Sequence, residues 1–102
     1  MNPIDITPED LATVRSILMQ FVPGYEVWAF GSRVTGKARR YSDLDLAIIT
    51  QQPLAFDTYA ALKAAFSESS LPFKVDIVDW MAADESFQKL IQQQHVIIKG
   101  RV

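Results

Sequence analysis

The segment Phe30–Ile48, "FGSRVTGKARRYSDLDLAI", contains the features that decide the fold. An apolar stretch ends at Gly31-Ser32, a basic segment follows, and a second apolar stretch opens with aspartates at positions 43 and 45. Glycine between two stretches of alternating apolar residues is typical of a turn that joins two strands. The segment therefore predicts a strand, a tight turn with a basic loop, and a second strand that carries acidic side chains.

The two aspartates of this segment, Asp43 and Asp45, are predicted to lie on one face of the second strand. Side chains two residues apart leave a strand on the same side, with Cβ atoms about 6–7 Å apart. Two carboxylates at this separation repel each other unless a cation lies between them. Magnesium binds through one or two carboxylates together with substrate phosphates. We therefore predict that both aspartates are catalytic and bind two Mg²⁺ ions, an arrangement that promotes in-line displacement at phosphorus.

A third carboxylate is expected in the stretch "FKVDIVDW", residues 73–80. Asp76 lies between Val75 and Ile77, so it is predicted to leave its strand on the face opposite to these apolar side chains. Asp79 has the other parity and falls on the apolar side. Asp76 is therefore the predicted third catalytic residue and metal ligand.

The glycine turn and the basic segment together predict a site for a polyphosphate. A turn without a Cβ lets a phosphate approach the backbone, and a helix that begins there would present free amides. Arginine and lysine side chains neutralise the phosphate charge. The predicted phosphate-binding residues are Gly31, Ser32, Arg33, Lys37, Arg39 and Arg40.

The remaining sequence predicts further helices and strands around this segment. Residues 6–22 carry apolar side chains at three- and four-residue spacing, and Thr7 followed by Pro8 is typical of a helix start. We expect a small α/β (α+β) fold, a mixed sheet with helices packed on one face and the carboxylates on the open face. Expected helices cover residues 6–22, 54–69 and 83–93, the last capped by Asp84, and expected strands cover residues 25–31, 42–50, 73–80 and 95–100.

Length and composition indicate a single globular domain over residues 1–102. There are no cysteines, which excludes disulfides and thiolate metal sites and agrees with a reducing cytoplasm. The net charge of −2 argues against nucleic acid as a partner. No apolar run approaches the ~20 residues that span a bilayer, and the acidic N-terminus lacks the pattern of a signal peptide. We therefore expect a cytoplasmic protein without a membrane partner.

The order of these motifs resembles the DNA polymerase β-like nucleotidyltransferases, and among them the minimal nucleotidyltransferases. The family pattern is Gly-Ser, a short spacer, Asp-x-Asp on a strand, and a third carboxylate on a later strand. This chain has Gly31-Ser32, Asp43-Leu44-Asp45 and Asp76 in that order. The resemblance implies a polymerase β-like fold. It also implies Mg²⁺-dependent transfer of a nucleoside monophosphate, most simply AMP from ATP, to a hydroxyl group.

The resemblance further implies the roles of the matching residues. Gly31 and Ser32 would hold the triphosphate. Asp43 and Asp45 would bind both metal ions, and Asp76 would help to bind the catalytic metal and to activate the acceptor. The basic residues are not a fixed part of the family pattern, so their assignment to nucleotide binding rests on charge alone.

Minimal members of this family are often encoded beside a small helical HEPN-domain protein, a toxin that they neutralise. Some attach AMP to a tyrosine of that toxin, so the resemblance implies an antitoxin that acts as a protein adenylyltransferase on a HEPN partner. The alternative is a binding module that covers the toxin, with weak or absent nucleotide chemistry. Transfer to an antibiotic is disfavoured, because the residues after Asp76 are too few for a further acceptor-binding domain.

Two aromatic side chains, Trp28 and Trp80, are interpreted as core or interface packing residues, and His95 is interpreted as a surface or satisfied histidine. His95 is the only histidine and has no acidic or histidine neighbour at ligand spacing. Both tryptophans lie in or beside expected strands, where buried aromatic side chains are common. None of the three is predicted as a ligand.

Overall fold

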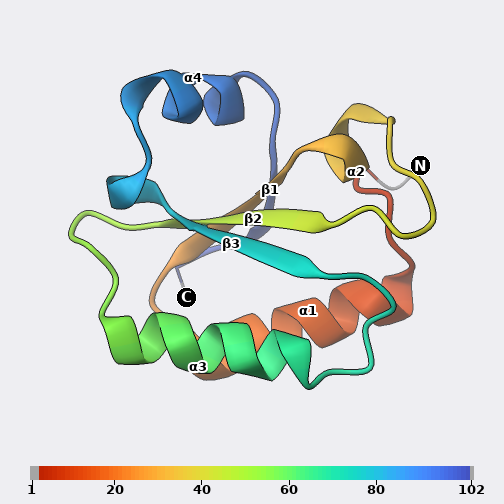
Figure 1. Cartoon of the computed structure of the whole chain (residues 1–102), viewed down its shortest axis with the longest axis horizontal. Helices are drawn as coiled ribbons and strands as arrows, with labels where there is room; N and C mark the ends of the chain where they lie inside the picture. Colours follow the sequence, from red (N-terminus) through yellow and green to blue (C-terminus); the bar gives the residue numbers. More distant parts are fainter. Residues whose placement is uncertain (1–2, 102) are drawn as a thin grey trace.

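The structure is a computed structural model that describes residues 3–101, so residues 1, 2 and 102 of the predicted domain lie outside it. Four strands, β1 (Glu26–Phe30), β2 (Leu44–Ile49), β3 (Val75–Asp79) and β4 (Val96–Lys99), form one sheet. Their order is β3-β2-β1-β4 (Figure 1). β1 is antiparallel to β2 and β4, whereas β3 is parallel to β2. The mixed sheet confirms the predicted fold class.

Two of the helices begin at side-chain caps that the sequence predicts, at Thr7 and Asp84. The helices are α1 (Pro8–Phe21), the one-turn α2 (Ser32–Thr35), α3 (Phe56–Ser67), the 3-10 turn η1 (Trp80–Ala82) and α4 (Glu85–Gln93). The Thr7 hydroxyl accepts a hydrogen bond from the Asp10 amide at 3.1 Å. The Asp84 carboxylate caps α4 in the same way. Among the described residues, no helix is long and apolar enough to span a bilayer.

One face of the sheet packs against α1 and α3 and forms the main core. Along β2, the side chains of Leu44, Leu46 and Ile48 point to this face, and all three are fully buried. Figure 1 shows α1 and α3 on the same side of the sheet, with α4 on the other. The core also includes Val14 and Leu18 of α1, Leu62 and Phe66 of α3, and Val27 and Ala29 of β1.

The opposite face is open at one end and covered at the other, whereas the sequence predicts helices on one face only. Ile91 of α4 is buried against Phe30 and Ala47, and Trp28 packs beside them. The physical reason is the apolar stripe of α4, in which Ile91 is buried against the sheet and Phe87, one turn earlier, contacts the Phe30 ring. Helix α4 therefore covers the apolar end of this face and leaves the carboxylate end accessible.

Candidate active site

The register between β2 and β3 brings two of the predicted carboxylates together. Asp45 lies directly opposite Asp76 in the parallel pair, and neighbouring strands are about 4.8 Å apart. Both residues alternate with buried residues of the main core, so their side chains lie on the α4 side of the sheet. Asp43 precedes β2 by one residue. The structure thus gathers all three predicted carboxylates at one end of one face.

Gly31 allows the backbone to lie against the Asp45 carboxylate. Phe30, the residue before it, pairs with Asp45 in the antiparallel ladder. Gly31 has φ 81° and ψ −158°, a conformation that is essentially restricted to glycine. A Cβ atom at this position would lie 2.2 Å from the Asp45 Oδ2 atom. Both the backbone angles and the close approach therefore require glycine here.

The turn after Gly31 places the first amides of α2 next to the carboxylate end of the sheet. The Gly31 carbonyl accepts hydrogen bonds from the amides of Val34 and Thr35, at 3.0 and 3.1 Å. The two preceding amides, those of Ser32 and Arg33, lie at the start of α2 and take no part in these bonds, as expected for a helix N-terminus. Such amides bind anionic oxygen atoms. The geometry suits the phosphate-binding role predicted for Gly31 and Ser32.

Asp45 lies close to two other acidic side chains, those of Asp76 and Asp43. Partial burial, followed by the charges of Asp76 and Asp43, raises the pKa of Asp45 to about 6. Both causes disfavour the ionised carboxylate. A bound cation would relieve the repulsion and restore the charged form, since an opposite charge nearby lowers a carboxyl pKa. The three aspartates therefore have the electrostatics of an incomplete metal site.

The carboxylate oxygens suit a Mg²⁺ ion that is bound by the protein and a substrate together. They are less suited to a metal ion that is bound by protein side chains alone. Among residues 3–101, no group of three or more acidic, histidine or cysteine side chains is arranged to hold a metal ion by itself, and the three predicted aspartates are no exception. Asp76 instead forms an ion pair with the Lys74 Nζ atom at 3.8 Å. Magnesium characteristically takes one or two carboxylates and completes its coordination with water and substrate phosphates. The site is consistent with Mg²⁺ that binds together with a polyphosphate.

Arg33 has a different place from the one predicted for it. Its side chain is buried, and its guanidinium donates hydrogen bonds to the carbonyl oxygens of Asp5 (2.7 Å), Ser42 (2.8 Å) and Arg40 (3.3 Å). It also lies 4.3 Å from the centroid of the Phe73 ring. Arg33 thus ties the loop before Asp43 to the N-terminal segment, and its donors are directed at carbonyls. A run of basic residues in a sequence does not reveal which of them is buried.

The other predicted cations, Lys37, Arg39 and Arg40, are exposed on the loop between α2 and β2. None of them forms an ion pair with a site carboxylate among the described residues. The loop is closed at its end, where the Arg39 amide donates to the Ser42 hydroxyl at 2.8 Å and the Ser42 amide donates to the Arg39 carbonyl at 3.0 Å. The Arg40 guanidinium lies 5.3 Å from the centroid of the Tyr41 ring, and the assignment of the three side chains to a polyphosphate stays a prediction.

A hollow of about 350 Å³ adjoins the carboxylates and extends around the edge strand β3, with lining residues from α3 on one face of the sheet and from α4 on the other. Asp45 and Asp76 line it together with the apolar side chains of Phe30, Val78 and Phe87. Phe87 is not among the predicted site residues, because its helical spacing indicates packing and no other signal in the sequence marks it. A larger hollow of about 550 Å³, beside Gln51, Gln52 and Arg101, contains none of the predicted site residues.

The packing residues lie where the sequence suggests. The His95 ring stacks on Trp28 with ring centroids 3.9 Å apart, and Trp80 meets Trp28 edge-on at 5.3 Å. His95 Nδ1 lies 3.0 Å from the Ile91 carbonyl oxygen. The Asp79 carboxylate, which is not a predicted site residue, accepts a hydrogen bond from the Leu54 amide. These groups hold α4 and the loop after β2 rather than a ligand.

Comparison with known proteins is consistent with this geometry. The family described as "Polymerase beta, Nucleotidyltransferase" matches residues 13–101. A Haemophilus influenzae protein named "Probable protein adenylyltransferase MntA" is 55% identical over 98 residues, which cover 96% of this chain and 86% of that protein.

Solved structures share the fold. A chain of a toxin–antitoxin crystal structure with AMP-PNP has a TM-score of 0.75 at 24% identity, covering 89% of this chain and 73% of its own. A structure described as a minimal nucleotidyltransferase has a TM-score of 0.67 at 28% identity, covering 86% of this chain and 88% of its own. These findings confirm the predicted family resemblance and the enzyme class that follows from it. The chain belongs to the polymerase β nucleotidyltransferase family.

Proposed function

We propose that this protein is a Mg²⁺-dependent protein adenylyltransferase that moves AMP from ATP to a tyrosine hydroxyl of a HEPN toxin and so acts as its antitoxin. The observation that carries this proposal is the meeting of Asp45, Asp76 and Gly31. The two carboxylates face each other across parallel strands. The Gly31 backbone lies against one of them, so close that an added Cβ would be 2.2 Å from the Asp45 Oδ2 atom. This is the arrangement that phosphoryl chemistry needs, in which positioning and charge neutralisation provide most of the catalysis.

Each part of the site has a distinct task in this reaction. The amides at Gly31-Ser32 bind the outer phosphates of the nucleotide and orient it. Asp43 and Asp45 would hold Mg²⁺, which would neutralise the charge that develops on the phosphate oxygens. Asp76 lies where it can accept the proton of the acceptor hydroxyl. The acceptor oxygen forms a bond to the α-phosphorus as the bond from that phosphorus to the bridging oxygen breaks, and pyrophosphate leaves.

The choice of AMP and of a protein acceptor is supported by the comparisons. The relative at 55% identity carries the name of a protein adenylyltransferase. A structure with a TM-score of 0.67 at 21% identity, covering 90% of this chain and 71% of its own, is of a tri-AMPylated HEPN toxin from Shewanella oneidensis in complex with an MNT antitoxin. The absence of cysteines from the sequence further supports our proposal that the reaction takes place in the cytoplasm.

Intact-protein mass spectrometry of the purified pair, this chain with the protein encoded beside it, tests the proposal. The pair is incubated with Mg²⁺ and each nucleoside triphosphate in turn. We expect the partner to gain one or more AMP units from ATP, and we expect the double variant Asp43→Asn/Asp45→Asn to abolish the gain. Asp57→Asn, an exposed aspartate in the first turn of α3, is the matched control and keeps full activity.

The same variants distinguish an enzyme from a steric antitoxin. If the Asp43→Asn/Asp45→Asn protein still binds and neutralises the toxin while no AMP is transferred by either protein, the chain acts by covering its partner and the enzyme proposal is wrong. Transfer of AMP to an aminoglycoside by this chain alone would instead identify a small molecule as the acceptor.

A further inference from the structure

The nucleoside half of the triphosphate has no binding residue among the groups described so far. The predicted site residues are assigned to phosphate, to metal or to the acceptor. All of them lie in the region that extends from α2 to the three carboxylates. The hollow beside Phe87 borders the same carboxylates, and its lining residues come from β1, β2, β3, α3 and α4. It is therefore a continuation of the site and not a separate cavity.

The direction of the strands shows which part of the ligand reaches this hollow. Along the exposed face of β3, the chain passes from Asp76 to Val78, which packs in the second apolar cluster with Ile91 of α4. Helix α2 follows the opposite end of the strands, next to Gly31. Figure 1 shows α2 and α4 at opposite ends of this face. With the outer phosphates at α2 and the α-phosphate at the carboxylates, the nucleoside extends toward α4.

Phe87 presents an aromatic ring at the far wall of the hollow. Its side chain is 36% exposed. The Phe30 ring supports it edge-on, with ring centroids 5.6 Å apart and an interplanar angle of 80°. An edge-on contact is a favoured arrangement of two aromatic rings and leaves part of the supported ring accessible. Part of the Phe87 ring is therefore accessible in the hollow that the two carboxylates also line, where a planar group can cover it.

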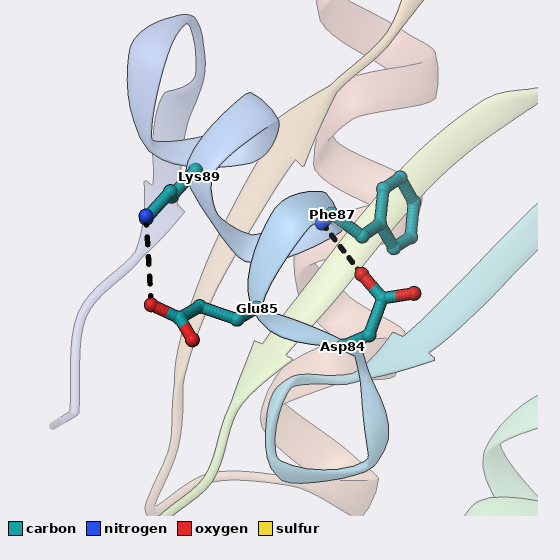
Figure 2. Close-up of polar contacts among 4 residues, drawn as sticks. All are labelled: Asp84, Glu85, Phe87 and Lys89. Atoms are coloured by element: carbon teal, nitrogen blue, oxygen red, sulfur yellow. Dashed lines mark hydrogen bonds and ion pairs between the residues drawn. The ribbon is translucent and has the colours of Figure 1, made fainter.

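The backbone around Phe87 is held in place at the start of α4. The Asp84 carboxylate accepts a hydrogen bond from the Phe87 amide at 2.8 Å, and Glu85 pairs with Lys89 at 3.5 Å on another side of the helix (Figure 2). Figure 2 shows the Phe87 ring directed away from that ion pair. Gln88 donates to the Trp80 carbonyl oxygen at 2.7 Å. The ring is thus positioned before any ligand arrives, which lowers the entropy cost of binding.

We propose that Phe87, supported by Phe30, is the stacking wall of a nucleoside subsite that takes the base of the triphosphate. The inference rests on the proposed function, because it assumes that a nucleoside triphosphate occupies the carboxylate end. Every base offers a planar π-face, so the wall provides affinity without strict selection among bases. The acceptor reaches Asp76 from the open side of β3, which is an edge strand of the sheet.

The test is a binding measurement that needs no AMP transfer. Isothermal titration calorimetry of the full chain compares AMP-PNP with inorganic tripolyphosphate, each with Mg²⁺. Phe87→Ala is expected to weaken AMP-PNP about tenfold, the loss typical of one stacked base, and to leave tripolyphosphate unchanged. Phe87→Trp should restore the affinity. Phe56→Ala, which removes an 80% exposed ring of α3 outside the hollow, should change neither ligand.

Each contrary result overturns the subsite. Equal weakening of both ligands by Phe87→Ala would show that α4 only supports the phosphate site. Unchanged AMP-PNP affinity with a raised KM for the acceptor protein would assign the hollow to the acceptor. If the wild-type chain does not bind AMP-PNP, no nucleoside triphosphate occupies the site, and the subsite proposal is wrong.

Failure of the proposed function has a different signature. In that case the wild-type pair transfers no AMP in the mass spectrometry experiment, while Phe87→Ala still loses AMP-PNP selectively. If the pair does transfer AMP and Phe87→Ala binds AMP-PNP as the wild type does, the proposed function stands and the nucleoside subsite is wrong.

Discussion

The two ends of a single sheet face have opposite character. At one end, Asp45 and Asp76 face each other in the open. Two residues further along the same strands, Ala47 and Val78 form a similar pair beneath α4. Both pairs have the same backbone geometry and differ only in the chemistry of the side chains and in what covers them. Because side chains on one face of a strand repeat every two residues, the acidic pair and the apolar pair are direct neighbours on this face.

The apolar end of this face contributes to stability, whereas the carboxylate end serves function at a cost in stability. The apolar end gains free energy of folding when Ile91 covers it. The carboxylate end loses free energy, since burial and like charges raise the pKa of Asp45 to about 6. Substitutions at four positions test this division between a stabilising end and a functional end: Gly31, Ile91, Arg33 and Asp45.

Gly31→Ala should damage both stability and activity. The new Cβ would lie 2.2 Å from the Asp45 Oδ2 atom, so the carboxylate or the turn must move by about 1 Å, which typically costs about 100-fold in rate. The backbone strain at φ 81° adds a loss of ~3 kcal/mol in the free energy of unfolding. Chemical denaturation and AMP-transfer rates provide the two readouts. Gly24→Ala, where no atom lies within 4 Å of the added Cβ, is the control and should be nearly neutral.

Ile91→Ala should destabilise the apolar end by about 3 kcal/mol, because it leaves a cavity beneath α4. Leu90→Ala is the neighbouring control; its side chain is 64% exposed, and a change within about 0.5 kcal/mol is expected. Thermal or urea unfolding measures both. Equal effects of the two substitutions would contradict the packing of α4 on the sheet.

Arg33→Gln should lower the free energy of unfolding by about 2 kcal/mol, because carbonyl oxygens of Asp5, Arg40 and Ser42 lose a charged donor. The exposed Lys37→Gln should have an effect below about 0.5 kcal/mol. If Arg33 instead binds phosphate, its replacement would weaken tripolyphosphate binding and leave the unfolding curve unchanged. Calorimetry and urea unfolding of both variants distinguish these roles.

Asp45→Asn should have the smallest effect on stability, and of the opposite sign. The folded pKa of about 6 exceeds the ordinary value of 3.8, so the protonated form favours folding below pH 3.8, and this contribution is lost as the pH rises through 6. Asparagine avoids that loss. We expect the metal-free variant to be more stable by about 1 kcal/mol at pH 7, after allowance for solvent screening.

Urea unfolding at pH 4 and pH 7, without Mg²⁺, measures this difference, which should nearly vanish at pH 4. Added Mg²⁺ with AMP-PNP should stabilise the wild type and have little effect on the variant. A variant less stable than the wild type at pH 7 would mean that Asp45 supports the fold.

Much of this arrangement follows from local patterns in the sequence. Alternation around Asp45 and Asp76 predicts both strands and the face that carries the acids. The register that sets these two residues opposite each other does not follow, because it depends on pairing between strands separated by α3. Burial of Arg33 is equally hidden, since its neighbours in the sequence are exposed cations. The stripe of α4 reveals an apolar face but not which side of the sheet it covers. Its spacing alone therefore does not mark Phe87 as a residue beside the carboxylates.

The parallel pairing of β2 and β3 has a consequence for the order of folding. Asp45 and Asp76 are separated by 31 residues of chain (76 − 45), and α3 must dock before the two strands meet. Closing a loop of this length costs entropy that local turns avoid, so contacts of this kind tend to form late. A partly folded chain can complete the hairpin of β1 and β2 and still lack half of its site. Catalytic activity would then show that β2 and β3 have paired, and a newly synthesised chain would remain inactive until that pairing forms.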